Sequence, residues 1–162
     1  AEWADGGKGG NARKGRGGRG EHFAVVDTVN GSKGFFPDES WVEVRDRILY
    51  IRGRRLRLMD EFGMEMMILS RNAPAVQAIP DAKKANEIAR KANDYLAEQV
   101  KKRPDRFQAL AALPLQDPDM AAWGFQRGGK ELGRVGEMAN GLSQIGDANT
   151  IAYLPEKPYR PF

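Results

Sequence analysis

Cysteine is absent from the 162-residue sequence, and histidine occurs once. Without cysteine, the chain can form neither disulfides nor thiolate metal sites, so nitrogen and oxygen ligands would have to hold any metal. No apolar run reaches the length of a membrane-spanning helix, and the first residues lack the apolar core of a secretion signal. These absences predict a cytoplasmic protein with no membrane partner.

The net charge of +4 is concentrated at the start of the sequence. Residues 1–20 hold five basic and two acidic side chains, so the remainder is nearly neutral. This glycine- and arginine-rich stretch has too few apolar groups to offset the entropy of ordering it, which predicts a disordered tail over 1–20 and one domain over 21–162. A flexible tail is favoured over an RNA-binding arm. The folded part offers no basic face, so nucleic acid is not an expected partner.

Apolar periodicity after Ser40 predicts alternating helices and buried strands. The expected helices are 40–51, 54–62, 81–102 and 117–132, with Asp81 and Asp117 as N-terminal caps. Nearly continuous apolar runs predict strands over 64–69, 107–113 and 135–139. Helices between buried strands imply parallel pairing, and hence an α/β barrel or a doubly wound sheet.

A basic cluster stands at the start of the second predicted helix. It contains Arg52, Arg54, Arg55 and Arg57. A phosphate site is one interpretation, but no glycine-rich loop or aromatic residue accompanies the arginines. A solvated helix face is therefore favoured.

Three motifs occur in one order with helix-length spacing between them. They are S-R-N-A-P-A-V-Q-A-I-P-D from Ser70, K-R-P-D-R-F from Lys102 and A-A-L-P-L-Q-D-P-D from Ala111. Together they resemble the gamma-resorcylate (2,6-dihydroxybenzoate) and 2,3-dihydroxybenzoate decarboxylases of the amidohydrolase-related family, over roughly residues 21–162. The resemblance implies a (β/α)8 TIM barrel with its active site at the carboxyl ends of the strands, a fold that typically needs about 250 residues. The expected fold is therefore a partial, amidohydrolase-like barrel, first half only.

The resemblance also implies a metal site on the first strand. In the family, a Glu-x-His element at the end of that strand binds a divalent metal, and zinc or manganese suits such ligands. His22 matches the family histidine, Gly20 stands at the position of the glutamate, and Glu21 matches the residue between them. Glu21 is a candidate ligand only if the strand shifts by one residue, which would turn its side chain to the other face. His22 without the resemblance would be interpreted as a solvent-exposed or capping residue.

Further candidate substrate-binding residues follow from the same resemblance. Phe35 matches an aromatic that packs on the substrate ring, Asn140 matches an amide near its polar groups, and the Ala73–Pro74 turn shapes the pocket wall. Ordinary core packing of Phe35 and a plain turn role for Asn140 are the alternatives. No catalytic acid or base of the family falls within this chain.

The resemblance implies a lyase activity, the metal-dependent, non-oxidative decarboxylation of a hydroxybenzoate, with a small aromatic carboxylic acid as substrate. Because the site is incomplete, two alternatives stay open. One is an inactive barrel fragment that acts through its open sheet edges, as a homo-oligomer or with a complementing half-barrel. The other is an RNA-binding tail on such a fragment, whose binding would collapse with salt.

Overall fold

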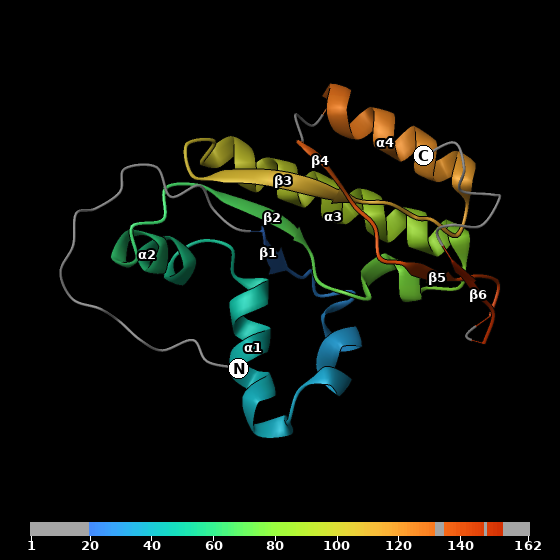
Figure 1. Ribbon diagram of the computed structural model, residues 1–162, viewed down its shortest axis with the longest axis horizontal. Helices are drawn as coiled ribbons and strands as arrows, with labels where there is room; N and C mark the ends of the chain where they lie inside the picture. Colours follow the sequence, from blue (N-terminus) through green and yellow to red (C-terminus); the bar gives the residue numbers. More distant parts are fainter. Residues whose placement is uncertain (1–19, 132–134, 148, 154–162) are drawn as a thin grey trace.

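A computed structural model describes residues 20–131, 135–147 and 149–153 of the chain (Figure 1). Of the tail predicted over residues 1–20, residues 1–19 lie outside the described residues. The elements, in chain order, are β1 (Gly20–Phe23), the 3-10 helix η1 (Val29–Phe35), α1 (Asp38–Leu49), α2 (Arg54–Glu61), β2 (Met67–Arg71), the 3-10 helix η2 (Ala75–Ala78), α3 (Ala82–Lys102), β3 (Phe107–Ala112), α4 (Pro118–Glu131), β4 (Gly136–Met138), β5 (Leu142–Gln144) and β6 (Ile151–Tyr153).

The central sheet is parallel, as the alternation of strands and helices predicts. Its order is β1-β2-β3-β4, so each strand pairs with the next along the chain. The register places His22 opposite Ser70 and Leu69 opposite Ala109. All carboxyl ends of these strands therefore meet at one edge, where the following loops gather.

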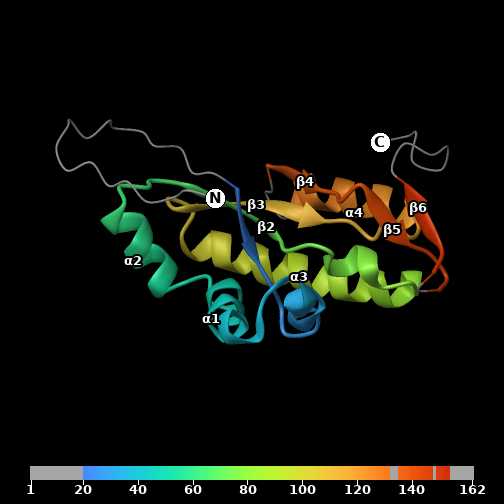
Figure 2. The same cartoon turned by 60° about the horizontal axis from the view of Figure 1, so that its bottom comes forward.

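Helices α1, α2 and α3 lie on one side of this sheet, as Figure 2 shows with the helices below the strands. The sheet face toward them is buried along β2 and β3, whereas Glu21 on β1 is exposed. We call it the closed face, and its members include Met67, Leu69, Phe107 and Ala109, each at most 5% exposed. Alternate residues of a strand point to opposite faces, so this set follows from the period of two in β2 and β3.

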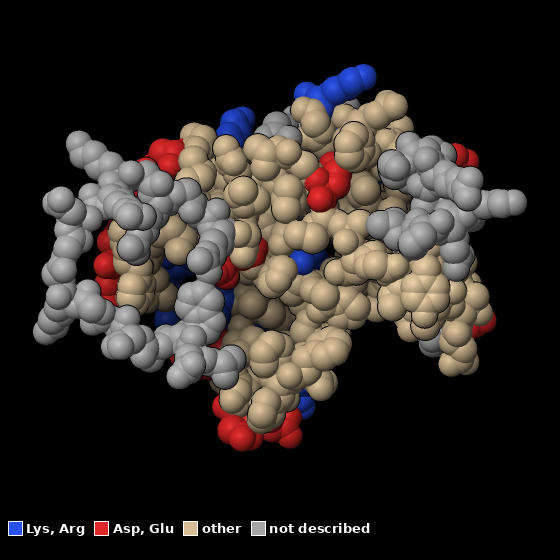
Figure 3. Space-filling model, viewed as in Figure 1, with Lys and Arg blue, Asp and Glu red and all other residues tan. Residues whose placement is uncertain are grey.

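The opposite side of the sheet, turned to the viewer in Figure 1, is less covered. We call it the open face. In the same view, Figure 3 shows that uncharged residues dominate the centre of this surface. Four of its side chains are half-buried although three of them are apolar, which identifies a surface of core-like composition; they are Ile68, Gln108, Leu110 and Met138. Ser70 and Ala112, on the same face, are buried.

Helix α3 is well determined by local signals. The Asp81 carboxylate accepts a hydrogen bond from the Lys84 backbone N–H at 2.7 Å, so the predicted cap is confirmed. The helix is fixed to the sheet by Asn93, which donates to the Ala112 carbonyl and accepts from the Ala112 N–H, both at 3.0 Å. The second predicted cap is confirmed as well, because Asp117 accepts from two backbone N–H groups at the start of α4.

Three features differ from the sequence prediction. Strand β1 begins at Gly20, a residue assigned to the tail, because its backbone pairs with the strongly apolar β2 regardless of its side chain. The strand predicted over 64–69 is instead Met67–Arg71, since Met64 follows the helix-ending Gly63, which has a φ of 64°. The β5–β6 hairpin was not predicted, because each of its strands has only three residues. No helix among the described residues is long and apolar enough to span a bilayer.

Candidate functional site

His22 stands at the carboxyl end of β1, as predicted. Its Nδ1 atom lies 3.1 Å from the hydroxyl oxygen of Ser70, the residue opposite it on β2. His22 is exposed whereas Ser70 is 1% exposed, so the imidazole is accessible to solvent at the carboxyl end of β1. The remaining ring nitrogen is thus available to a ligand that approaches from the open face.

A hydrogen-bonded network surrounds the Ala73–Pro74 turn beside this histidine. The Asn72 amide donates to the Ser32 hydroxyl, and Ser32 donates to the Ala73 carbonyl at 2.7 Å. Asn72 and Ser32 are both buried. These bonds join the segment after β1 to the loop after β2. They also fix the Ala73–Pro74 turn, which the resemblance assigns to the pocket wall, through the Ala73 carbonyl.

Gln77 connects this turn to the segment that contains Asn140. The side chain of Gln77 is buried, accepts from the Asn140 N–H at 2.6 Å, and donates toward the carbonyls of Asn140 and Leu142. The Asn140 amide donates to the Pro74 carbonyl at 3.4 Å. The structure therefore brings together Asn140, Pro74 and Ala73, three of the residues predicted from the sequence.

Several polar atoms buried at the strand ends have no hydrogen-bond partner among the described residues. They include Nε and Nη1 of Arg71, Oδ1 of Asn72 and Oε1 of Gln116. Arg71 is 4% exposed, its Nη2 group donates to the Thr28 hydroxyl, and its guanidinium lies 5.6 Å from the centre of the Phe23 ring. Burial lowers the pKa of Arg71 to about 10, while the carboxylate of Asp27 acts in the opposite direction. Buried polar atoms without a protein partner are positions where a water, an ion or a ligand group can bind.

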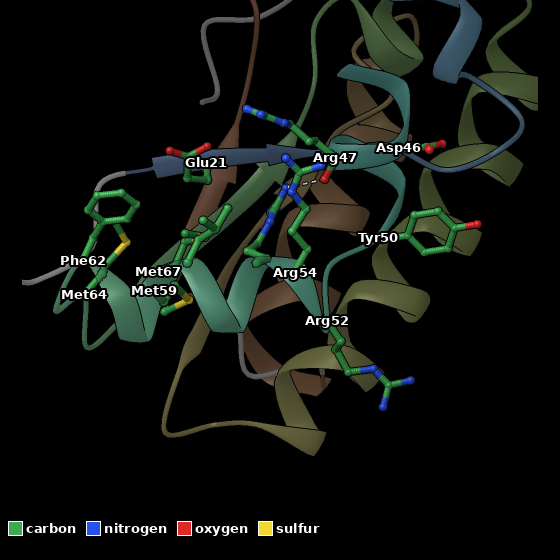
Figure 4. Close-up of a pocket in the computed structure, with 12 residues that line it drawn as sticks. Glu21, Asp46, Arg47, Tyr50, Arg52, Arg54, Met59, Phe62, Met64 and Met67 are labelled. Carbon is green, nitrogen blue, oxygen red and sulfur yellow. Dashed lines mark hydrogen bonds between the residues drawn. The ribbon is translucent and has the colours of Figure 1, made fainter. Parts of the chain in front are cut away.

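Two of the predicted site residues are not part of the hydrogen-bonded network around the Ala73–Pro74 turn. Phe35 ends η1 with 73% of its surface exposed, while its neighbour Phe36 stacks on Trp41 at 6.0 Å between ring centres. Glu21 lines a pocket beside α2, together with Met67 of the closed face (Figure 4). Because Glu21 and His22 are adjacent on a strand, their side chains leave it on opposite faces.

A complete metal site is not present among the described residues. No group of three or more His, Cys, Asp or Glu side chains in this part of the chain is placed to hold a metal. His22 supplies one nitrogen ligand, and a stable divalent site needs at least three protein ligands. The donor set of residues 20–131, 135–147 and 149–153 therefore does not by itself fit the metal that the resemblance implies.

Comparison with known proteins adds to this geometry. No family model matches the chain. A gamma-resorcylate decarboxylase of Rhizobium radiobacter is 58% identical over 142 residues, which are 88% of this chain and 43% of that protein. The chain is similar to the N-terminal half of gamma-resorcylate decarboxylases.

Solved structures agree with this similarity. A 2,6-dihydroxybenzoate decarboxylase in complex with 2,6-dihydroxybenzoate is 56% identical, with a TM-score of 0.85 over 89% of this chain and 45% of its own. A dihydroxybenzoic acid decarboxylase of Polaromonas sp. JS666, with bound manganese and the inhibitor 2-nitroresorcinol, is 53% identical with a TM-score of 0.84 over 90% and 45%. The fold is thus a partial amidohydrolase-type TIM barrel, as predicted. The chain spans less than half the length of the gamma-resorcylate decarboxylases it matches.

Sequence reasoning missed the buried amides that hold the site. Gln77 joins the loop after β2 to the segment after β4, and Gln116, in the loop after β3, donates to the Val76 and Ile79 carbonyls. Both residues lie inside the motifs that carry the family resemblance. Their signal was an uncharged polar residue within an otherwise apolar stretch, which is typical of a side chain that satisfies loop backbone groups.

Proposed function

We propose that this chain contributes the first part of a metal-dependent hydroxybenzoate decarboxylase, a lyase that releases carbon dioxide from a small aromatic carboxylic acid. The principal support is the grouping of His22, the Ala73–Pro74 turn and Asn140 at the carboxyl ends of parallel strands, in a chain more than half identical to gamma-resorcylate decarboxylases. Active sites of (β/α)8 barrels lie at this end of the strands. A 2,6-dihydroxybenzoate is the proposed substrate class.

In this proposal the chain's own residues bind and orient the substrate. Asn140 and the orphaned amide oxygen of Asn72 offer polar contacts for hydroxyl groups, and Phe35, exposed at the end of η1, offers an aromatic ring for the substrate ring to pack on. His22 contributes one nitrogen to a divalent cation, manganese or zinc. The cation would stabilise negative charge on the substrate during loss of carbon dioxide.

The remaining ligands must come from residues beyond those described here. The sheet offers a place for them, since among the described strands β1 and β4 each pair on one side only. An unpaired strand edge accepts a further strand through its free backbone groups. We therefore include in the proposal a partner that supplies the rest of the barrel, either a continuation of the polypeptide or a complementing second chain.

The decisive experiment measures carbon dioxide release and metal content. The chain is assayed with 2,6-dihydroxybenzoate and Mn²⁺ or Zn²⁺, alone and together with a separately expressed C-terminal half of a gamma-resorcylate decarboxylase. We expect turnover only in the mixture, and its loss in His22→Ala. A mixture that binds no metal and releases no carbon dioxide would leave the alternative of an inert assembly fragment.

Gly20 offers a gain-of-function test of the ligand assignment. A Cβ atom built at Gly20 meets nothing within 4 Å, and Gly20 lies on the same strand face as His22, two residues before it. Gly20→Glu is therefore expected to strengthen metal binding in the mixture by about tenfold or more, as one added ligand does. The matched control is Glu21→Gln, which alters the opposite face. Equal effects of the two changes would contradict the assignment.

A further inference from the structure

A pocket lies on the face of β1 opposite the His22 side chain. Its volume is about 590 Å³, within the range of small-molecule sites. Its lining comes from the end of α1, from α2 and from the edge of the closed face near Met67. We call it the β1–α2 pocket, and Figure 4 shows its side chains.

One end of the β1–α2 pocket is strongly basic. Four arginines line it, Arg47, Arg52, Arg54 and Arg55. Arg47 and Arg54 share the single carboxylate of Glu43, at 2.6 and 3.0 Å, and Arg52 forms no ion pair with any described residue. The lining carboxylate of Asp46 is paired with Arg45 at 3.8 Å. The positive charge at this end is therefore only partly compensated within the described chain.

Arg55 is the one half-buried cation of these four, and part of its guanidinium has no partner. Its Nη2 group donates to the backbone carbonyls of His22 and Arg47, at 2.8 and 3.1 Å, while its buried Nη1 group has no partner. Burial lowers the pKa of Arg55, and the charge of Glu21 opposes this. Carbonyl oxygens satisfy hydrogen bonds but do not neutralise a guanidinium, so an anion that reaches Nη1 would relieve an unpaired buried donor.

Apart from the Glu21 carboxylate on β1, the other end of the β1–α2 pocket is apolar. In Figure 4, Met59, Met64, Met67 and Phe62 gather at one end, whereas Arg52 points away at the other. Met59 and Met67 are buried, and Phe62 is 64% exposed although its ring is apolar. Methionine side chains adapt to ligands of irregular shape. This end suits a hydrocarbon body rather than a second charged group.

We infer that the β1–α2 pocket binds an organic anion with an apolar body, its acidic group against Arg54 and Arg55 and its hydrocarbon part against Met59, Met67 and Phe62. Guanidinium groups bind carboxylates and phosphates in a fixed, bidentate geometry, which gives the site its preference for oxyanions. The tail over residues 1–19 does not suit the site, because its sequence has an excess of basic side chains. This inference is independent of the decarboxylase proposal, since the pocket lies on the opposite face of β1 from the His22 side chain.

The test uses octanoate as the probe and octanamide as its neutral counterpart. Each is titrated into the isotope-labelled full chain while backbone amide signals are followed by NMR. We expect octanoate to shift signals of α1, α2 and the residues around Met67, with at least about tenfold tighter binding than octanamide and with weakening at high salt. Equal binding of the two probes, or shifts confined to the group around His22, would overturn the inference.

Matched arginine variants complete the test. The double change Arg54→Gln with Arg55→Gln is expected to weaken octanoate binding by about tenfold, the loss typical of charge-assisted contacts. Arg57→Gln, on the same helix but outside the pocket lining, is expected to change it less than twofold, roughly the scale of a surface charge. Deletion of residues 1–19 should leave affinity unchanged. Similar losses in the double variant and Arg57→Gln, or a large loss on deletion, would refute a site built from the pocket arginines.

Discussion

The two faces of the parallel sheet differ in how completely this chain covers them. On the closed face, Leu69 and Phe107 have no exposed surface beneath the helices. On the open face, Ile68 and Leu110 are only half-buried although they occupy the same strands. The difference separates a closed core, on which stability depends, from the face that carries His22. The closed face is a buried core. The open face carries His22 and has apolar side chains, as a core does, but they are only half-buried.

The largest expected effect comes from removing a core side chain from each face. Leu69→Ala should lower the free energy of unfolding by about 2–5 kcal/mol, because it leaves a cavity in a closed core. The matched change Leu110→Ala should cost about 1 kcal/mol or less, since less apolar area is lost from a half-buried site. Urea denaturation followed by circular dichroism measures both. Equal losses would show that the open face is covered in solution.

Arg71 is a charged residue among the buried apolar side chains of the closed face, and an apolar replacement should stabilise that face. By the alternation of β2 it follows Met67 and Leu69, yet two of its nitrogen atoms are buried without partners. Arg71→Met should therefore raise the free energy of unfolding by about 1–3 kcal/mol, since it removes an uncompensated buried charge.

Arg106 provides the matched control for this prediction. It is a partly buried arginine that is fully engaged, with Asp60 at 2.6 Å and the carbonyls of Glu65 and Met64. Arg106→Met should lower stability in the same thermal and urea measurements. A loss of stability in both variants would mean that Arg71 has an anionic partner in solution.

A change in the loops at the strand ends should lower the free energy of unfolding by less than a change in the closed core and by more than a change at His22. Gln77→Met keeps the side-chain volume but removes the bonds to the Asn140 and Leu142 backbone. We expect a loss of about 1–2 kcal/mol in unfolding free energy. Hydrogen exchange should become faster at Asn140 and in the β5–β6 hairpin, with the closed face unaffected. Faster exchange throughout the closed face would contradict the separation of the two regions.

The smallest effect on stability is expected for His22. It is exposed, and its one side-chain hydrogen bond to the described residues is with Ser70, so His22→Gln should change the free energy of unfolding by about 0.5 kcal/mol or less. The same variant should abolish metal binding in the mixture with a complementing half-barrel. A large loss of stability would instead identify His22 as a structural residue. The open face would then also contribute to stability, against the comparison drawn above.

Much of the fold followed from local patterns, because a helix cap and a buried strand are determined within a few residues. Asp81 and the apolar run at Phe107 predicted α3 and β3 nearly to the residue. The position of β2 was displaced, since Met64 and Met67 are equally apolar and the boundary depends on pairing with β1 and β3. For the site, the family motifs identified Ala73, Pro74 and Asn140, whereas nothing local indicated that Gln77 joins them.

The sequence by itself determined the order of the four α-helices and of β2, β3 and β4, the parallel pairing and the family resemblance, because these depend on residue spacing. Only the tertiary structure decided that Glu21 and the arginines at the start of α2 line one pocket. It also decided that Arg71 is buried without full pairing. Each of these depends on which side chains far apart in the sequence meet, and spacing along the chain does not encode that.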